Sequence, residues 1–209
     1  MPLIPWWVIL SSGMAFVSLI GGWATAASLQ PTSFDPFTQT ISSLYADGAT
    51  DRWLITSVLV VVGVCYIATA YGLDAVRTSA RVSLLIGGVA SVLLALFPEP
   101  EDGTSLQHLV TTGVGFTALA IWPCLAIERR PSAPWALRPA ATITFTVTVA
   151  VSSVWFLLEL HAHSAAGLAE RVVTGLQATW PVIVATCLRG VPQRARRPQA
   201  SVEGQTADG

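Results

Sequence analysis

The chain has 209 residues, of which 53% are hydrophobic and only 11% are charged. An average soluble domain carries about 25% charged residues, so the composition excludes an ordinary water-soluble fold and indicates an integral membrane protein. All eleven cationic side chains are arginine, and they form no large basic block interleaved with aromatic residues. This pattern argues against a nucleic-acid partner and leaves membrane lipids as the expected partners, while the sequence names no protein partner.

Six stretches are long and apolar enough, or nearly so, for membrane-spanning helices, each of which needs roughly 20 apolar residues. They are residues 6–29, 53–73, 82–97, 108–127, 140–160 and 167–188, and the third is the shortest because Pro98 bounds it. None alternates with a period of two residues, so the sequence predicts an all-α, polytopic transmembrane bundle of about six helices. The first stretch is longer than a signal-peptide core and no basic residue precedes it, which predicts a retained helix.

The connection over residues 30–52 is the longest between two predicted helices. It contains Asp35-Pro36, a pair typical of an N-cap followed by proline at the first helical position. The apolar side chains that would then share one helical face are Phe37, Ile41, Leu44 and Tyr45. We therefore expect a short interfacial helix between helices one and two. It would be either a structural lid or a lid over an outward-facing pocket.

Arginine placement predicts the orientation. Nine arginines fall in connections and a tail that six alternating helices put on one side: Arg77, Arg81, Arg129, Arg130, Arg138, Arg189, Arg194, Arg196 and Arg197. The positive-inside rule makes that side cytoplasmic, which predicts a multi-pass protein of the plasma (inner) membrane with both termini in the cytoplasm. Residues 1–188 form the predicted bundle. Residues 189–209 are rich in Arg, Pro, Gln, Ser and Gly, and predict a disordered cytoplasmic tail.

The sixth predicted helix carries an intramembrane polar stripe. Glu170, Thr174 and Gln177 are spaced at i, i+4 and i+7 and share one face. Ionisable residues such as Glu170 and Arg171 inside an apolar helix normally face protein or water and have a partner, and Glu159 at the end of helix five could pair with Arg171. Two interpretations stay open. Either these residues form an interhelical salt bridge, or Glu159, Glu170, Arg171 and Gln177 line a ligand-binding cavity.

All three histidines fall on the predicted outer side, together with several acids. His108, His161 and His163, with Asp102, are a donor set that would suit Zn²⁺, and a bound metal there could activate water. The signal is not diagnostic, because the sequence contains no HExxH motif and the donors come from two separate loops. The alternative is interfacial histidines that form hydrogen bonds with nearby acids. No cofactor is certain, and Zn²⁺ is the one the donor set would accept.

The layout resembles the bacterial domain-of-unknown-function family 998, a set of six-helix membrane proteins. The resemblance lies in three short motifs: Asp35-Pro36 with Thr40-Ile41-Ser42-Ser43-Leu44, Phe97-Pro98 with Asp102 and His108, and Gly167-Leu168-Ala169-Glu170-Arg171. It spans about residues 6–188, and it implies the fold and the membrane location without supplying an activity.

A more distant likeness is to membrane hydrolases of the alkaline ceramidase type, which combine serine, aspartate and three histidines around zinc. The residues in corresponding roles would be Ser42 or Ser43, Asp102, His108, His161 and His163. The chain departs from that family by its His-x-His pair and by having one helix fewer. This resemblance is an analogy at the level of the fold.

Three functions remain open on these grounds, and the sequence does not decide whether the protein is an enzyme. The first is a bundle that binds a lipid or small amphiphile, or supports partner proteins at the outer face. The second is a metal-dependent hydrolase that acts on a lipid through an outward-facing His/Asp site. The third is a small transporter that uses the stripe from Glu170 to Gln177, although the sequence lacks the inverted repeat typical of such proteins.

Overall fold

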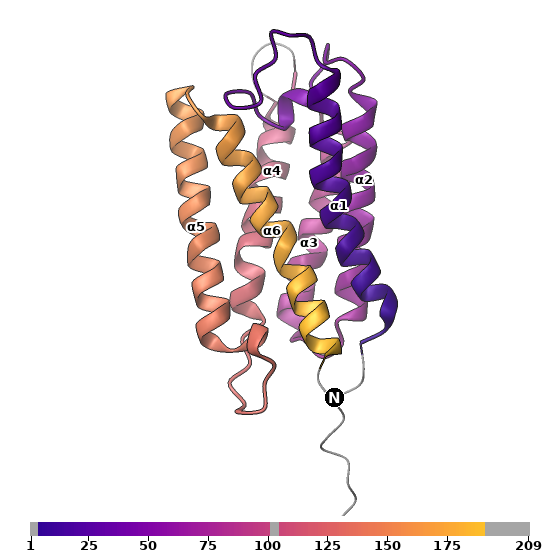
Figure 1. The fold of residues 1–209 in the computed structure, drawn as a ribbon, viewed down its shortest axis with the longest axis vertical. Helices are drawn as coiled ribbons and strands as arrows, with labels where there is room; N and C mark the ends of the chain where they lie inside the picture. Colours follow the sequence, from indigo (N-terminus) through magenta and orange to yellow (C-terminus); the bar gives the residue numbers. More distant parts are fainter. Residues whose placement is uncertain (1–3, 101–104, 191–209) are drawn as a thin grey trace, which may run out of the picture.

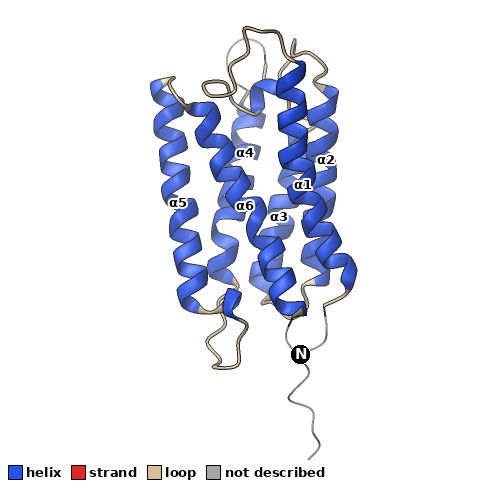
Figure 2. Cartoon of the chain, in the orientation of Figure 1, coloured by secondary structure: helices blue, strands red, loops and turns tan. Residues whose placement is uncertain are grey.

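The computed structural model describes residues 4–100 and 105–190, and these residues form six α-helices and two short 3₁₀ helices (Figures 1 and 2). The α-helices are α1 (Trp6–Leu29), α2 (Trp53–Gly72), α3 (Thr78–Leu94), α4 (Leu106–Leu125), α5 (Pro139–Ala162) and α6 (Ala166–Arg189). The 3₁₀ helices are η1 (Ser42–Leu44) and η2 (Trp135–Leu137). No strand occurs in the described ranges, so the predicted all-α bundle is confirmed.

Five of the helices, α1, α2, α4, α5 and α6, are long and apolar enough to cross a membrane. Helix α3 has 17 residues and is about 25 Å long, slightly less than the ~30 Å hydrocarbon core of a bilayer. Many large apolar side chains on the bundle exterior are exposed, as expected where lipid rather than water surrounds the chain. The protein is therefore a multi-pass integral membrane protein.

Successive helices pack against one another, with α3 between α2 and α4, and α1 between α2 and α6 (Figure 1). Helices α2 and α3 come into backbone contact at Gly63 and Gly88, where a Cβ added to Gly63 would lie 2.5 Å from the carbonyl oxygen of Gly88. Small residues at such crossings let backbones touch, which is a usual way of packing helices in membranes. Helix α5 packs on α6 and α4 at the edge of the bundle.

Helix α3 differs from its predicted range of 82–97, because it begins and ends earlier. Its first turn tolerates Arg81 because that side chain turns back to α2, where it donates to the carbonyl oxygens of Ala70 at 2.8 Å and Tyr71 at 2.9 Å. At the other end, the helix stops at Leu94 and the chain turns before Pro98. The residue before a proline disfavours the helical conformation, which explains why the apolar residues 95–97 are not helical.

The predicted interfacial helix at residues 35–45 forms only in part. Asp35 does cap a turn, because its Oδ1 accepts from the backbone N–H of Phe37 at 3.0 Å. The residues that follow form turns rather than a continuous helix, and only η1 is helical. The predicted apolar face is nevertheless used at Ile41, Leu44 and Tyr45, which are buried, whereas Phe37 is exposed.

The two ends of the bundle carry different residues. The 30–52 segment lies at one end, at the top of Figure 1. The other end, which we call the Arg-rich end, carries the described arginines Arg77, Arg81, Arg129, Arg130, Arg138 and Arg189. Six helices in alternation put the start of α1 and the end of α6 at the Arg-rich end as well. Residues 191–209, most of the predicted tail, lie outside the described residues.

Candidate functional site

The first turn of α6 is bonded to the 30–52 segment. The backbone N–H of Leu168 donates to the carbonyl oxygen of Phe37 at 2.9 Å, and that of Gly167 donates to Thr38 at 3.3 Å. The first amides of a helix have no partner within the helix, and Ala165 at the N-cap offers no side-chain acceptor. Backbone carbonyls of a segment about 130 residues earlier therefore cap α6.

Glu170 and Arg171 strengthen the same contact from two sides. The buried carboxylate of Glu170 accepts from the backbone N–H of Ile41 through Oε2. Arg171 Nη1 donates to three carbonyl oxygens, those of Pro36, Gln39 and Gly167, each at 2.9 Å. We call these two side chains with residues 36–41 the α6 clasp. Its described contacts give both ionisable groups a structural task, since each holds backbone groups of the 30–52 segment.

The expected pairing of Glu159 with Arg171 is not formed. Glu159 instead accepts locally, from the indole Nε1 of Trp155 at 3.0 Å, from the Ser164 hydroxyl, and from the backbone N–H of Ala165 at 2.9 Å. These bonds hold the turn between α5 and α6. Because Glu159 finds three donors within six residues and Arg171 finds carbonyl oxygens, neither needs the other.

Gln177 lies deeper, beside a small chamber inside the bundle. Its Nε2 donates to the carbonyl oxygen of Phe116 at 3.1 Å, and it is 2% exposed. The chamber has a volume of about 80 Å³, and its walls come from α1, α2, α3, α4 and α6. The Oγ1 atom of Thr112 also lines it and has no hydrogen-bond partner among the described residues. A space of this size suits a few water molecules rather than a lipid.

The predicted metal ligands lie in different surroundings. His108 is buried near the start of α4, where Nδ1 lies 3.0 Å from the carbonyl oxygen of Phe97 and the ring lies 5.8 Å from that of Tyr45. His161 and His163 are exposed at the end of α5. Among the described residues, no group of three His, Cys, Asp or Glu side chains could hold a metal ion. Asp102 lies outside those residues, so the zinc site stays a prediction.

Tyr45 completes the packing under the 30–52 segment. Its side chain is buried beside His108, and burial raises the pKa of its hydroxyl, with smaller contributions from the carboxylates of Glu170 and Glu99. The backbone N–H of Asp47 also donates to the carbonyl oxygen of Glu99 at 3.0 Å, which ties the segment to the chain that follows α3. This end of the bundle is therefore closed by direct contacts within the protein.

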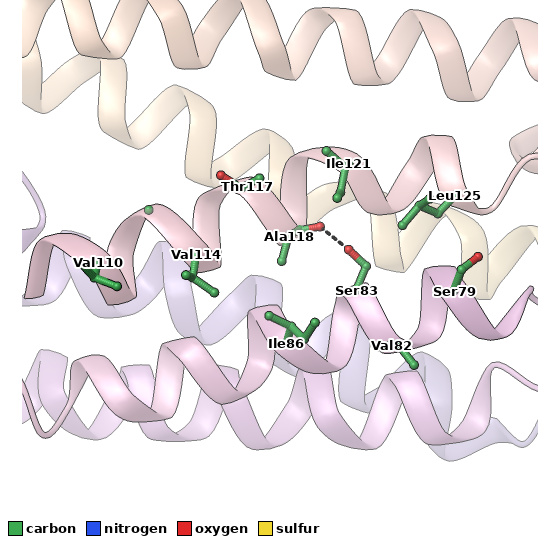
Figure 3. Close-up of a pocket in the computed structure, with 11 residues that line it drawn as sticks. Ser79, Val82, Ser83, Ile86, Val110, Val114, Thr117, Ala118, Ile121 and Leu125 are labelled. Atoms are coloured by element: carbon green, nitrogen blue, oxygen red, sulfur yellow. Dashed lines mark hydrogen bonds between the residues drawn. The ribbon is translucent and has the colours of Figure 1, made fainter. Parts of the chain in front are cut away.

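A groove that was not predicted from the sequence lies elsewhere, between α3 and α4. We call it the α3–α4 groove; it has a volume of about 580 Å³, and the side chains that line it come from α3 and α4 (Figure 3). The residues that line it are Ser79, Val82, Ser83, Ile86, Val110, Gly113, Val114, Thr117, Ala118, Ile121 and Leu125. Ser83, at its floor, donates to the carbonyl oxygen of Ala118 at 2.8 Å and so presents no free donor to the groove.

A second, smaller groove lies on the other side of α3. This α2–α3 groove has a volume of about 200 Å³ and is lined by Ala70, Tyr71, Thr78, Arg81, Val82 and Leu85. Val82 lines both grooves. Neither groove could be predicted from the sequence. The small and branched residues on α3 and α4 do not reveal how the two helices pack against each other.

Comparison with known proteins identifies a family and supplies no activity. The family described as "Protein of unknown function (DUF998)" matches residues 13–187. No curated protein and no solved structure was found to match the chain.

Proposed function

Because the chain belongs to the DUF998 family, whose description names no activity, we propose a function from its own geometry: the protein binds a membrane lipid, with an acyl chain in the α3–α4 groove. The observation that supports this proposal is the groove itself, whose volume of about 580 Å³ lies in the usual range of 300–1,000 Å³ for ligand sites. The ligand-binding role expected of Glu159, Glu170, Arg171 and Gln177 stays a separate prediction.

The lining of the groove suits hydrocarbon. Its rim consists of exposed branched side chains such as Val82, Ile86 and Val114, with the exposed Gly113 beside them, and the small buried residue Ala118 lies at its floor. Together these residues form a channel with mainly apolar walls. Each methylene that enters such a channel gains about 0.8 kcal/mol if it leaves water, and less if it leaves the bilayer, where the gain is close packing.

The shape and lining of the groove suit an acyl chain. A lipid chain is a single file of methylene groups and needs no hydrogen-bond partner. Ser83 already uses its hydroxyl inside the protein, and the lining otherwise carries side-chain polar groups only at Ser79 and Thr117.

The orientation places the groove relative to the two leaflets. The Arg-rich end faces the cytoplasm under the positive-inside rule, in the plasma membrane of a bacterium, and both termini lie on that side. The groove extends from Ser79 and Leu125, near the Arg-rich end, to Val110, in the second turn of α4. The groove thus begins near the cytoplasmic end and follows most of the length of α4 across the membrane.

Filling the groove tests the proposal. A Cβ at Gly113 would meet nothing within 4 Å, so Gly113→Phe should fit the fold and occupy the groove. The matched control is Gly21→Phe, since Gly21 is also exposed, also has nothing within 4 Å, and lies on α1 away from the groove. We expect Gly113→Phe to weaken phospholipid binding by up to about tenfold, because ~0.8 kcal/mol for each of two displaced methylenes is the upper limit that applies to transfer from water.

The measurement is native mass spectrometry of the full chain released from detergent with added phospholipid. Gly21→Phe should retain the wild-type amount of bound lipid. If both variants lose lipid equally, or neither does, then the lipid that remains with the protein is bound around the whole perimeter and the proposal is wrong.

A further inference from the structure

The two grooves described above meet at the start of α3. Ser79 lines the α3–α4 groove and Thr78 lines the α2–α3 groove, so both begin at the first turn of the helix. Val82, one turn further, belongs to the walls of both. Two apolar channels therefore run side by side along one helix from a shared origin at the Arg-rich end. A ligand with two hydrocarbon chains joined at one point has this shape.

The surroundings of this shared origin carry an excess of positive charge. The charged residues in the two connections at this end, up to Arg130, are Asp74, Arg77, Arg81, Glu128, Arg129 and Arg130. Arg81 forms an ion pair with Asp74 at 3.2 Å, and Arg130 with Glu128 at 2.9 Å. Within the described residues Arg77 and Arg129 form no ion pair. Two arginine charges thus remain available to an anion.

Arg77 is the better placed of the two. It is the N-cap residue of α3, directly before Thr78 and Ser79, and it is exposed. Its charge also acts on the α4 side of the groove: the pKa of Glu128 is lowered, first by the hydrogen bond from Arg130 and, among smaller contributions, by the charge of Arg77. A charge that reaches Glu128 from the start of α3 also reaches the mouth of the α3–α4 groove.

We propose that an anionic phospholipid with two acyl chains lies astride the first two turns of α3, with one chain in each groove and its phosphate at Arg77. This inference rests on the proposed lipid binding and adds the class of lipid, the number of chains and the residue that selects the headgroup. The basic residues of a cytoplasmic membrane surface each contribute about 1 kcal/mol toward anionic lipid, so Arg77 should provide about a fivefold preference.

The chain-number claim is tested at Val82, which borders both grooves. Val82→Phe narrows both, and Val89→Phe is a matched control because Val89 lies on the same face of α3, is similarly exposed (43% against 46%) and lines neither groove. The probes are dioleoyl phosphatidylglycerol and its one-chain lyso form. We expect the two-chain lipid to bind more tightly than the one-chain form, and Val82→Phe to remove that difference.

The headgroup claim is tested at Arg77. Arg77→Gln should weaken binding of dioleoyl phosphatidylglycerol about fivefold and that of dioleoyl phosphatidylcholine less, because the choline cation offsets the charge of its phosphate. Arg189→Gln, at the same end of the bundle but outside both grooves, is the control. Arg81 is not substituted in this experiment, because its hydrogen bonds to the end of α2 support the fold.

The outcomes separate this inference from the function on which it rests. If the two headgroups bind equally, or Arg77→Gln behaves as Arg189→Gln does, the assignment of the phosphate to Arg77 is overturned. Equal binding of the one-chain and two-chain probes overturns the use of both grooves. In each of these cases, loss of lipid in Gly113→Phe but not in Gly21→Phe would still support lipid binding in the α3–α4 groove. If Gly113→Phe keeps its lipid, the proposed function is overturned as well.

Discussion

Gly167 is the residue at which α6 and the 30–52 segment come closest. A Cβ at this position would lie 2.1 Å from the carbonyl oxygen of Gln39 and 2.6 Å from that of Pro36. Both atoms belong to backbone, and both also accept hydrogen bonds from Arg171. The absence of a side chain at Gly167 is therefore a condition for the α6 clasp to form.

Replacing Gly167 by alanine should destabilise the protein by about 1–3 kcal/mol, because the added methyl group forces backbone apart. Gly175→Ala is the control on the same helix, since its added Cβ would make only ordinary contacts of 3.7 and 3.8 Å with Trp23 and Ile20. Alanine also favours a helix over glycine, so this control should keep or raise the melting temperature. Thermal unfolding in detergent checks both, and equal melting temperatures would contradict the role given to Gly167.

The three histidines should differ in their effect on stability. His108→Ala should lower the melting temperature, because it removes the bond to the carbonyl of Phe97 and the contact with Tyr45 inside the fold. His161→Ala and His163→Gly should not, because both side chains are exposed; glycine suits residue 163, whose φ is 54°. The same preparations test the predicted zinc: a shared site requires that all three variants lose bound metal together.

At the scale of the residue, the sequence could identify which polar groups matter but not what they bind. Glu170, Arg171 and Gln177 stand out because an ionisable or amide side chain is costly inside an apolar helix. Their partners are backbone groups of the distant residues Ile41, Gln39 and Phe116. Because every residue has such backbone groups, the sequence cannot show which of them is the partner. Charge complementarity suggested Glu159 for Arg171, and this pairing was wrong because both residues have other hydrogen-bond partners.

At the scale of the element, the 30–52 segment shows how a local pattern yields to a tertiary contact. The N-cap at Asp35 and the apolar spacing that follows it favour a helix. A helix would use the carbonyl oxygens of residues 36–39 internally, but in the fold these oxygens accept from α6 and Arg171. The buried apolar residues Ile41, Leu44 and Tyr45 were nevertheless correctly placed on the protein side.

Removing the acceptor at Glu170 should loosen this segment. Glu170→Ala leaves the buried N–H of Ile41 without its partner, so hydrogen exchange over residues 36–45 should become faster. Glu170→Gln retains an oxygen at the same place and should restore much of the protection. Glu159→Ala serves as the comparison, because it should affect only the turn near Ser164. Unchanged exchange in Glu170→Ala would show that the clasp does not hold the segment.

The helices themselves follow closely from the sequence, since continuous apolar runs are a strong signal and lipid allows few alternatives. The α3–α4 groove does not. It depends on which faces of two helices meet, and the lipid-facing and buried positions of these helices are similarly apolar. Val82 and Ile86 therefore carry no sign, in the sequence alone, that they border a groove rather than a packed interface.

At the scale of the whole molecule, the distribution of arginine predicts the orientation in the membrane. A reporter fused after residue 209 should be active only if it works in the cytoplasm, as fluorescent proteins do. A fusion after Ser164, in the turn between α5 and α6, should show activity only with a reporter that works outside the cytoplasm, such as a periplasmic phosphatase. The reverse pattern would invert the orientation and move the Arg-rich end to the outer surface.

The backbone contact between Gly63 and Gly88 has a mechanical consequence. No side chain lies between the two glycines, and Val92 and Ile67 pack beside them, so α2 and α3 are held backbone to backbone at this crossing. When membrane tension or temperature alters the thickness of the bilayer, the two helices should tilt as a single rigid plate. The α2–α3 and α3–α4 grooves would then keep their width while the surrounding lipid stretches. The affinity for a bound lipid would therefore not depend on membrane tension.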